Sequence, residues 1–166
     1  MERNMKRVEV GDAIAIYDLG VHYYRGNKGL RQNYQKAVEL WLRAGELGCA
    51  TANHNLGNCY HNGVGVERDM KKAIYYYELA ATGGDPAARF NLGLLEENEG
   101  NVNRAVKHFM IAAGAGCDDS LRHVQLGYMN GHATKDDFEK ALHTHKDAKD
   151  EMESEQREAA AAAFYG

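Results

Sequence analysis

This 166-residue chain has few residues that would break a helix or cross-link it. Pro86 is the only proline, and the three cysteines Cys49, Cys59 and Cys117 are too few, and uneven in number, for a disulfide framework. No Cys-x-x-Cys pair is present, so we do not expect a zinc site built on cysteines. Sparse, unpaired cysteines favour a reducing compartment, and we therefore predict a cytoplasmic or nuclear protein.

The chain also lacks long apolar runs and a strong charge of either sign. No run of 18 apolar residues occurs, so we expect no membrane span. The first ten residues lack the apolar segment of a secretory signal. The 20 basic and 24 acidic residues give a net charge of −4, which provides no general attraction to phosphates. Nucleic acid is therefore not an expected partner.

Motifs of catalysis and of cofactor binding are missing as well. The chain has no G-x-S-x-G, H-E-x-x-H, P-loop or EF-hand pattern. His54 and His61 lie seven residues apart on one predicted helix, with no third strong ligand beside them. The sequence therefore predicts no catalytic residues, no metal and no cofactor, and indicates a protein that is not an enzyme.

Glycine is abundant, with 18 residues, and the glycines fall at regular intervals. A pattern of Gly, Ala, Leu-Gly, Tyr and a closing Gly recurs four times, with two copies that depart from it. Glu96 replaces the tyrosine in the third copy, and Ser120, Val124 and Gln125 replace the alanine, the leucine and the second glycine in the fourth. The alanine, leucine and tyrosine are four residues apart and so share one helix face. The four copies open at Gly11, Gly48, Gly84 and Gly116.

A second pattern follows in each copy: a basic residue and alanine, then a bulky residue, then a small one. This spacing also predicts a helix, so each repeat is a pair of helices. A glycine inside a helix costs about 1 kcal/mol, so we expect the glycines of the Leu-Gly pairs (Gly20, Gly57, Gly93) to lie against a neighbouring helix. The opening glycines of the second, third and fourth copies should end helices with positive φ. The bulky residues are Trp41, Tyr77, Phe109 and His145.

Residues 61–93 closely follow a known repeat pattern. The loop G-x-G-V-x-x-D-x-x-K-A runs from Gly63 to Ala73, and the closing A-A-x-x-G runs from Ala80 to Gly84. Over residues 11–152 the chain thus resembles the Sel1-like repeats, a tetratricopeptide-like family. The resemblance implies an all-α fold, a right-handed α/α superhelix of about four antiparallel helix pairs, that works as an adaptor or scaffold.

The predicted organisation has three parts. Residues 1–10 are an N-terminal extension or remnant helix, residues 11–152 are the repeats, and residues 153–166 are a C-terminal helical extension and tail. Thr134 to Asp137 resembles a capping box, and residues 136–164 contain no strong helix breaker, so we expect one long C-terminal capping helix. The repeats span about 11–47, 48–83, 84–115 and 116–152.

In tetratricopeptide-like solenoids the first helix of each pair lines the concave surface, and this similarity predicts a partner-binding groove. Phe90, Leu94 and Leu126 have an alternative role as core between repeats. The recurring asparagines at the helix ends have an alternative role in turns. The predicted groove residues are Tyr17, Val21, Tyr24, Arg25, His54, Asn58, His61, Asn62, Phe90, Leu94, Glu97, Asn98, Arg122, Leu126, Met129 and Asn130.

The sequence therefore predicts a non-catalytic scaffold that holds a peptide or segment of a partner protein on its concave surface. One alternative is a regulatory or substrate-recruiting module of a larger enzyme, for example a ubiquitin-ligase-type assembly. A weak hydrolase and a purely structural spacer are the others. For the oligomeric state we expect a monomer or a weak homodimer formed through the terminal repeats.

Overall fold

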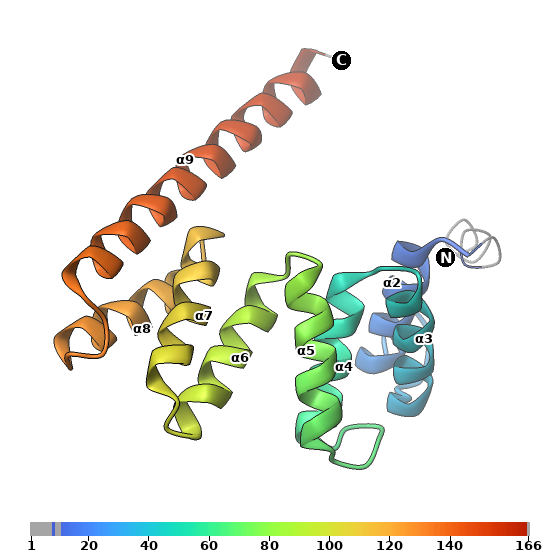
Figure 1. The fold of residues 1–166 in the computed structure, drawn as a ribbon. Helices are drawn as coiled ribbons and strands as arrows, with labels where there is room; N and C mark the ends of the chain where they lie inside the picture. Colours follow the sequence, from blue (N-terminus) through green and yellow to red (C-terminus); the bar gives the residue numbers. More distant parts are fainter. Residues whose placement is uncertain (1–7, 9–10, 166) are drawn as a thin grey trace. The chain divides into compact units, whose positions relative to one another are not determined.

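The computed structural model describes residue 8 and residues 11–165, with side chains through residue 163. Eight helices and no strand occur in this described part, which confirms the predicted all-α class. None of these helices has the length and apolar character that crossing a membrane requires. The predicted extension over residues 1–10 lies outside the described residues, apart from the buried, helical Val8. The helices are α2 (Ala13–Arg25), α3 (Tyr34–Glu46), α4 (Ala50–Asn62), α5 (Met70–Thr82), α6 (Pro86–Asn98), α7 (Val102–Gly114), α8 (Asp118–Met129) and α9 (Lys135–Tyr165) (Figure 1).

The chain divides into two compact units, residues 1–88 and 89–166. In the N-terminal unit α2 packs against α3, α3 against α4, and α4 against α5. In the C-terminal unit α7 packs against α8 and α9, and α8 packs against α9. Neighbours in space are thus mostly neighbours in sequence, which is the packing expected of helix pairs in a repeat protein.

Short polar side chains fix where the helices begin. Asp12 accepts hydrogen bonds from two backbone N–H groups of the first turn of α2, each at 3.0 Å. Asn33 and Asp69 cap α3 and α5 in the same way, at 2.9 and 3.0 Å. Before α9, the Thr134 N–H donates to Asp137 at 3.0 Å and the Asp137 N–H donates to the Thr134 hydroxyl at 3.1 Å, which confirms the capping box.

The glycines that open the repeats end the preceding helices. Gly48, Gly84 and Gly116 have φ values of 86°, 87° and 83°, as predicted. This left-handed conformation is strained for residues with a Cβ atom, which explains why glycine recurs there.

The glycines inside the first helix of each pair let an aromatic ring from the second helix come close. A Cβ atom added at any of these positions would lie less than 3.0 Å from the ring. The three rings are almost fully buried. The predicted approach of a neighbouring helix is therefore confirmed. The pairs are Gly20 with Trp41, Gly57 with Tyr77, and Gly93 with Phe109.

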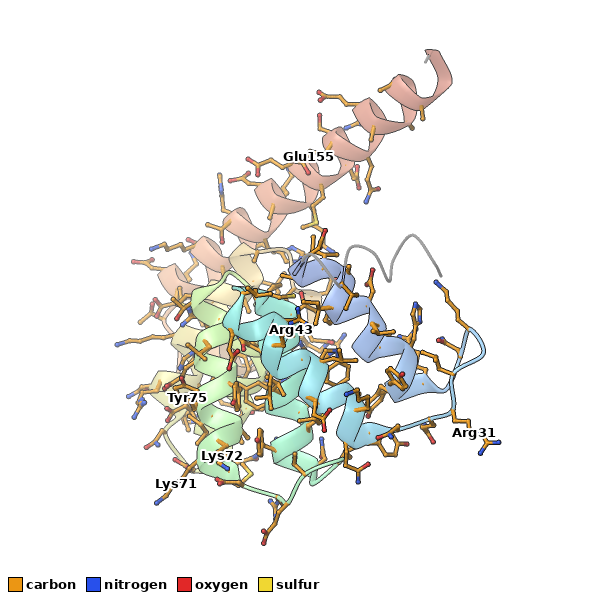
Figure 2. The ribbon with its side chains drawn as sticks, turned by 90° about the vertical axis from the view of Figure 1, so that its right-hand side faces the viewer. Arg31, Arg43, Lys71, Lys72, Tyr75 and Glu155 are labelled. Carbon is orange, nitrogen blue, oxygen red and sulfur yellow. The ribbon has the colours of Figure 1, made fainter. Side chains whose placement is uncertain are left out.

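Helix α9 has 31 residues and is about 46 Å long, as expected for one continuous helix. Its first half packs against α7 and α8, and the Met152 methyl group contacts Gly116. Residues 153–163 are all exposed, and Glu155 in this segment points into solvent (Figure 2). The N-terminal part of α9, up to Met152, thus packs against α7 and α8, while the side chains of residues 153–163 are exposed.

Candidate functional site: a cleft between α2 and α4

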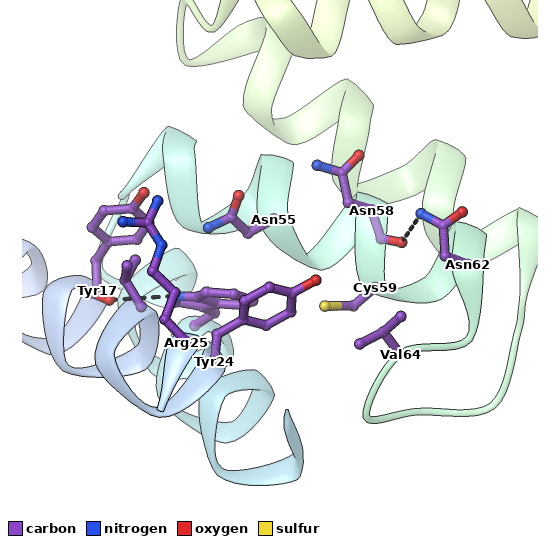
Figure 3. A pocket seen from close by; sticks show the side chains of 10 residues that line it. Tyr17, Tyr24, Arg25, Asn55, Asn58, Cys59, Asn62 and Val64 are labelled. Atoms are coloured by element: carbon purple, nitrogen blue, oxygen red, sulfur yellow. Dashed lines mark hydrogen bonds between the residues drawn. The ribbon is translucent and has the colours of Figure 1, made fainter. Parts of the chain in front are cut away.

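A cleft of about 290 Å³ lies in the N-terminal unit (Figure 3). Its two walls are α2 and α4, and α3 supplies one residue. Six of the predicted groove residues line it: Tyr17, Val21, Tyr24, Arg25, Asn58 and Asn62. The other four lining residues, which were not among the predicted groove residues, are Trp41, Asn55, Cys59 and Val64.

The wall formed by α2 is aromatic and held in place from behind. Tyr17, Val21 and Tyr24 are spaced four and three residues apart, so they share one face of α2. The indole Nε1 of Trp41 donates to the Tyr17 carbonyl at 3.2 Å. The Tyr24 ring lies 5.3 Å from the Trp41 ring and 5.1 Å from the Tyr34 ring, centroid to centroid. These contacts fix the α2 wall before any ligand arrives.

The wall formed by α4 consists mainly of amides. Asn58 is largely occupied within the protein, since its Oδ1 accepts from the buried Tyr77 hydroxyl at 2.8 Å and its Nδ2 lies 3.2 Å from the His54 ring nitrogen. Asn62 donates from Nδ2 to the Asn58 backbone carbonyl at 2.9 Å (Figure 3). Its Oδ1 has no hydrogen-bond donor among the described residues. Asn55 and Asn62 are therefore the amides that can serve a ligand.

The charge in the cleft is small and positive. Arg25 is the one charged residue in the lining, and it makes no ion pair with a described residue. Burial raises the pKa of Tyr17, partly offset by a hydrogen bond with Asn55, and burial also raises the pKa of Tyr24. Burial raises the pKa of the Cys59 thiol to about 11. At neutral pH the cleft thus presents neutral hydroxyl and thiol groups beside one cation.

The two predicted histidines of α4 lie on another side of that helix. The ring centroids of His54 and His61 are 6.1 and 6.5 Å from the Tyr77 ring. His54 Nδ1 lies 3.6 Å from Asp85, and burial lowers the His54 pKa although Asp85 acts in the opposite direction. Neither histidine lines the cleft.

The predicted aromatic and aliphatic residues of α6 are partly buried. Phe90 and Leu94 pack against the core cluster of the C-terminal unit, and the Phe90 ring lies 5.7 Å from the Phe109 ring. Their contacts match the alternative considered from sequence, a role in the core.

The other predicted residues of the C-terminal unit lie on exposed surface. Glu97 is 3.4 Å from His123, and Arg122 is 3.2 Å from Asp119. Leu126 and Met129 are exposed on α8. Asn98 ends α6, and Asn130 caps α8 just before the left-handed Gly131.

The missed residues of α4 have a geometric explanation. The prediction used equivalent positions in α2 and α4, counted from Leu19 and Leu56. The two helices that form the walls present partly different flanks to the cleft, so only some equivalent positions line it on both walls, namely Val21 with Asn58 and Arg25 with Asn62. The lining stripe of α4 is accordingly 55, 58, 59 and 62, instead of 54, 58, 61 and 62. A spacing of three and four residues from Asn55 was the available signal.

Comparison with known families gives a match to one family, described as Sel1 repeat. The matching segments are residues 13–49, 50–85 and 123–143, together more than half of the chain. The first two segments start and end within a few residues of the helix pairs α2/α3 and α4/α5, and the third covers parts of α8 and α9.

Solved structures show the same fold. A Sel1 repeat protein from Oxalobacter formigenes aligns with a TM-score of 0.75 and 26% identity, over 89% of this chain and 62% of that one. A protective antigen of uropathogenic Escherichia coli with an SLR fold also has a TM-score of 0.75, at 32% identity, over 90% of this chain and 33% of that one. The predicted α-solenoid class is thereby confirmed.

Curated relatives are much longer proteins. The ERAD-associated E3 ubiquitin-protein ligase component HRD3B of Arabidopsis thaliana is 35% identical over 103 residues, which are 61% of this chain and 16% of that protein. Protein sel-1 homolog 2 of Homo sapiens is 34% identical over 88 residues, 53% of this chain and 13% of that protein. The chain thus spans about a sixth or less of these relatives' length. Together they point to adaptor and protein-interaction roles.

Proposed function

Because the chain belongs to the Sel1 repeat family, we propose that it is a non-catalytic scaffold and that the cleft between α2 and α4 holds a segment of a partner protein. The single observation that carries this proposal is the composition of the cleft: partly buried aromatic side chains, amides and one unpaired cation converge on about 290 Å³. Ligand-binding pockets combine apolar area with a few placed polar groups in this way.

The size and shape of the cleft favour a short, extended segment. A volume of about 290 Å³ is at the lower end of ligand sites, so it accommodates a few side chains and not a folded domain. The amides of Asn55 and Asn62 can pair with the backbone of such a segment, while Val21, Tyr24 and Val64 offer apolar contact.

The rigidity of the cleft supports binding as well. The Tyr24 ring packs edge-on against Tyr34 and at a tilt against Trp41, and Asn62 is held by the Asn58 carbonyl. Side chains that are already ordered lose little conformational entropy when a ligand binds. More of the contact free energy then appears as affinity.

A second candidate is a regulatory or recruiting part of a larger enzyme assembly. The names of two relatives favour it, since one is an E3 ubiquitin-protein ligase component and another is chitin synthase regulatory factor 3 of Schizosaccharomyces pombe. In this case the same cleft would recruit the segment. The weak hydrolase is disfavoured because Cys59, the thiol of the cleft, stays protonated at neutral pH. A cytoplasmic or nuclear location and a weak homodimer remain predictions.

A cleft-filling substitution tests the proposal. Asn55→Trp places an indole in the cleft, and Glu78→Trp adds the same side chain to the exposed surface of α5 as a matched control. After circular dichroism shows that both variants are folded, proteins captured by each are quantified by mass spectrometry. The proteins captured by the wild type define the partner set. We expect Asn55→Trp to capture at least about 10-fold less of these partners, whereas Glu78→Trp should capture them in wild-type amounts. Equal capture by both variants would mean that the cleft is not the binding site.

A further inference from the structure

The hydrogen-bond donors of the cleft gather at one end. Figure 3 shows the Arg25 guanidinium beside the Tyr17 ring, with the Asn55 amide on the opposite wall. The Asn55 amide and the charge of Arg25 both act on the pKa of the Tyr17 hydroxyl. Three polar side chains from two helices therefore lie in this part of the cleft lining.

All three groups can donate to an anion. A guanidinium carries five N–H donors, an amide carries two, and a protonated phenol carries one. The lining includes no carboxylate, and Asp18, whose charge also reaches Tyr17, is not part of it. An acceptor with negative charge is the chemical partner that satisfies this end, and a carboxylate can take bidentate hydrogen bonds from arginine.

The other end of the cleft is apolar with one free acceptor. Tyr24, Cys59 and Val64 lie together there (Figure 3). Asn62 also lines the cleft and keeps its Oδ1 available, because its Nδ2 is already committed to the Asn58 carbonyl. An acceptor at this end suits the backbone N–H of a chain that continues past the cleft.

We infer that the cleft recognises an acidic residue inside a peptide segment, with its side-chain carboxylate held by Arg25, Tyr17 and Asn55 and a neighbouring apolar side chain at Cys59 and Val64. This inference rests on the proposed function and specifies its ligand. A side-chain carboxylate fits better than a chain-terminal one, since polar groups at both ends of the cleft suit a segment that passes through it.

Two displayed libraries of random heptapeptides, one fused at its C-terminus and one with a free C-terminal carboxylate, are selected on the full chain. The same selections use Arg25→Gln, and Arg31→Gln serves as a matched control because Arg31 is an exposed arginine outside the cleft (Figure 2). We expect the fused library to enrich Asp or Glu next to an aliphatic residue on wild type and Arg31→Gln, but not on Arg25→Gln.

Affinities of synthetic peptides with blocked ends then measure the contact. Replacing the acidic residue of an enriched peptide by its amide should weaken binding to wild type about 10- to 100-fold, and should change little with Arg25→Gln. Arg25→Lys should restore only part of the affinity, because lysine cannot donate in a bidentate manner.

The outcomes separate the inference from the proposed function. Enriched peptides that lack acidic residues but lose binding to Asn55→Trp would overturn the inference and leave the proposed function standing. Enrichment from the free-carboxylate library alone would do the same, in favour of a terminal carboxylate. If neither library yields a peptide that prefers wild type to Asn55→Trp, both the inference and the peptide-binding function are wrong.

Discussion

The first three helix pairs and the last one are closed by different interactions. In the first three, an aromatic ring of the second helix fills the notch left by a glycine in the first. In α8/α9 the corresponding residues are Gln125 and His145. This pair therefore has neither the glycine notch nor a Trp, Tyr or Phe ring to fill it.

Polar contacts replace the ring in the last pair. His145 Nε2 lies 2.8 Å from Asp118 Oδ1, and Lys149 Nζ lies 3.1 Å from Asp118 Oδ2. The Tyr128 and Phe138 rings also stack, with centroids 5.6 Å apart. A buried ring in a notch depends on shape and is insensitive to pH and salt, whereas an exposed ion pair depends on both. The comparison suggests that close packing holds the first pairs and that electrostatics contributes more to the last.

The largest expected effect comes from removing a notch-filling ring. Tyr77→Ala leaves a cavity at Gly57 and removes the donor to Asn58, so we expect the free energy of unfolding to fall by roughly 3–5 kcal/mol. His145→Ala, the equivalent change in the last pair, should cost much less because it removes an exposed polar contact. Urea unfolding, monitored by far-UV circular dichroism, measures the free energy of unfolding of both variants. Equal losses of unfolding free energy in the two variants would show that the ring and the polar contacts stabilise their helix pairs to the same extent.

Filling the notch tests the same comparison from the other side. Gly57→Ala adds a methyl group less than 3.0 Å from the Tyr77 ring, and we expect overpacking of about 1–3 kcal/mol to outweigh the gain in helix propensity. Gln125→Ala, at the exposed equivalent position of α8, should be neutral or slightly stabilising. Thermal unfolding midpoints compare the two substitutions. A stabilised Gly57→Ala protein would contradict the close approach of α4 and α5.

A smaller effect, dependent on pH, is expected for the polar contacts of α8/α9. Hydrogen bonds from Lys149 and His145 lower the pKa of Asp118 below its usual value of 3.8, so folding favours the charged carboxylate. This stabilisation is present at neutral pH and is lost as the pH falls through the lowered pKa. Asp118→Asn should therefore lower the unfolding midpoint at pH 7 and have a smaller effect at pH 3, and added salt should reduce the effect at pH 7.

Glu155→Gln is the control for this experiment, because Glu155 lies on the exposed end of α9 and makes no ion pair with a described residue. It should leave the midpoint unchanged at both pH values. If Asp118→Asn behaves like the control at pH 7, the contacts of Asp118 do not stabilise the last pair.

The smallest effect is expected from shortening α9. Removing residues 153–166 deletes a segment whose described side chains are all exposed, so the unfolding midpoint should stay unchanged while the helical signal decreases. A lowered unfolding midpoint would show that residues 153–166 make contacts that stabilise the α8/α9 pair.

The helices could be predicted closely because their signals are local. Asp12, Asn33 and Asp69 cap helices, and Gly48, Gly84 and Gly116 end them, through contacts within a few residues. The notch pairs were also partly predictable, since a costly glycine inside a helix requires a neighbour. Spacing did not show that the neighbour is the aromatic residue of the same repeat.

The cleft was predicted less completely, because it depends on how two helices face each other. The α2 residues Tyr17, Val21, Tyr24 and Arg25 all line it. On α4, a stripe shifted by one residue brought in Asn55 and Cys59 and left out His54 and His61. A rotation of one position is about 100° around a helix, and repeat spacing alone does not fix it.

The sequence by itself determined the all-α class, the repeat of helix pairs and the helix ends, because capping, glycine conformation and apolar spacing act within a few residues. Only the tertiary structure decided which flank of α4 faces α2, that Asn58 is occupied by Tyr77, and that Arg25, Tyr17 and Asn55 line one cleft. These features depend on contacts between residues far apart in the chain, and packing, not local propensity, sets them.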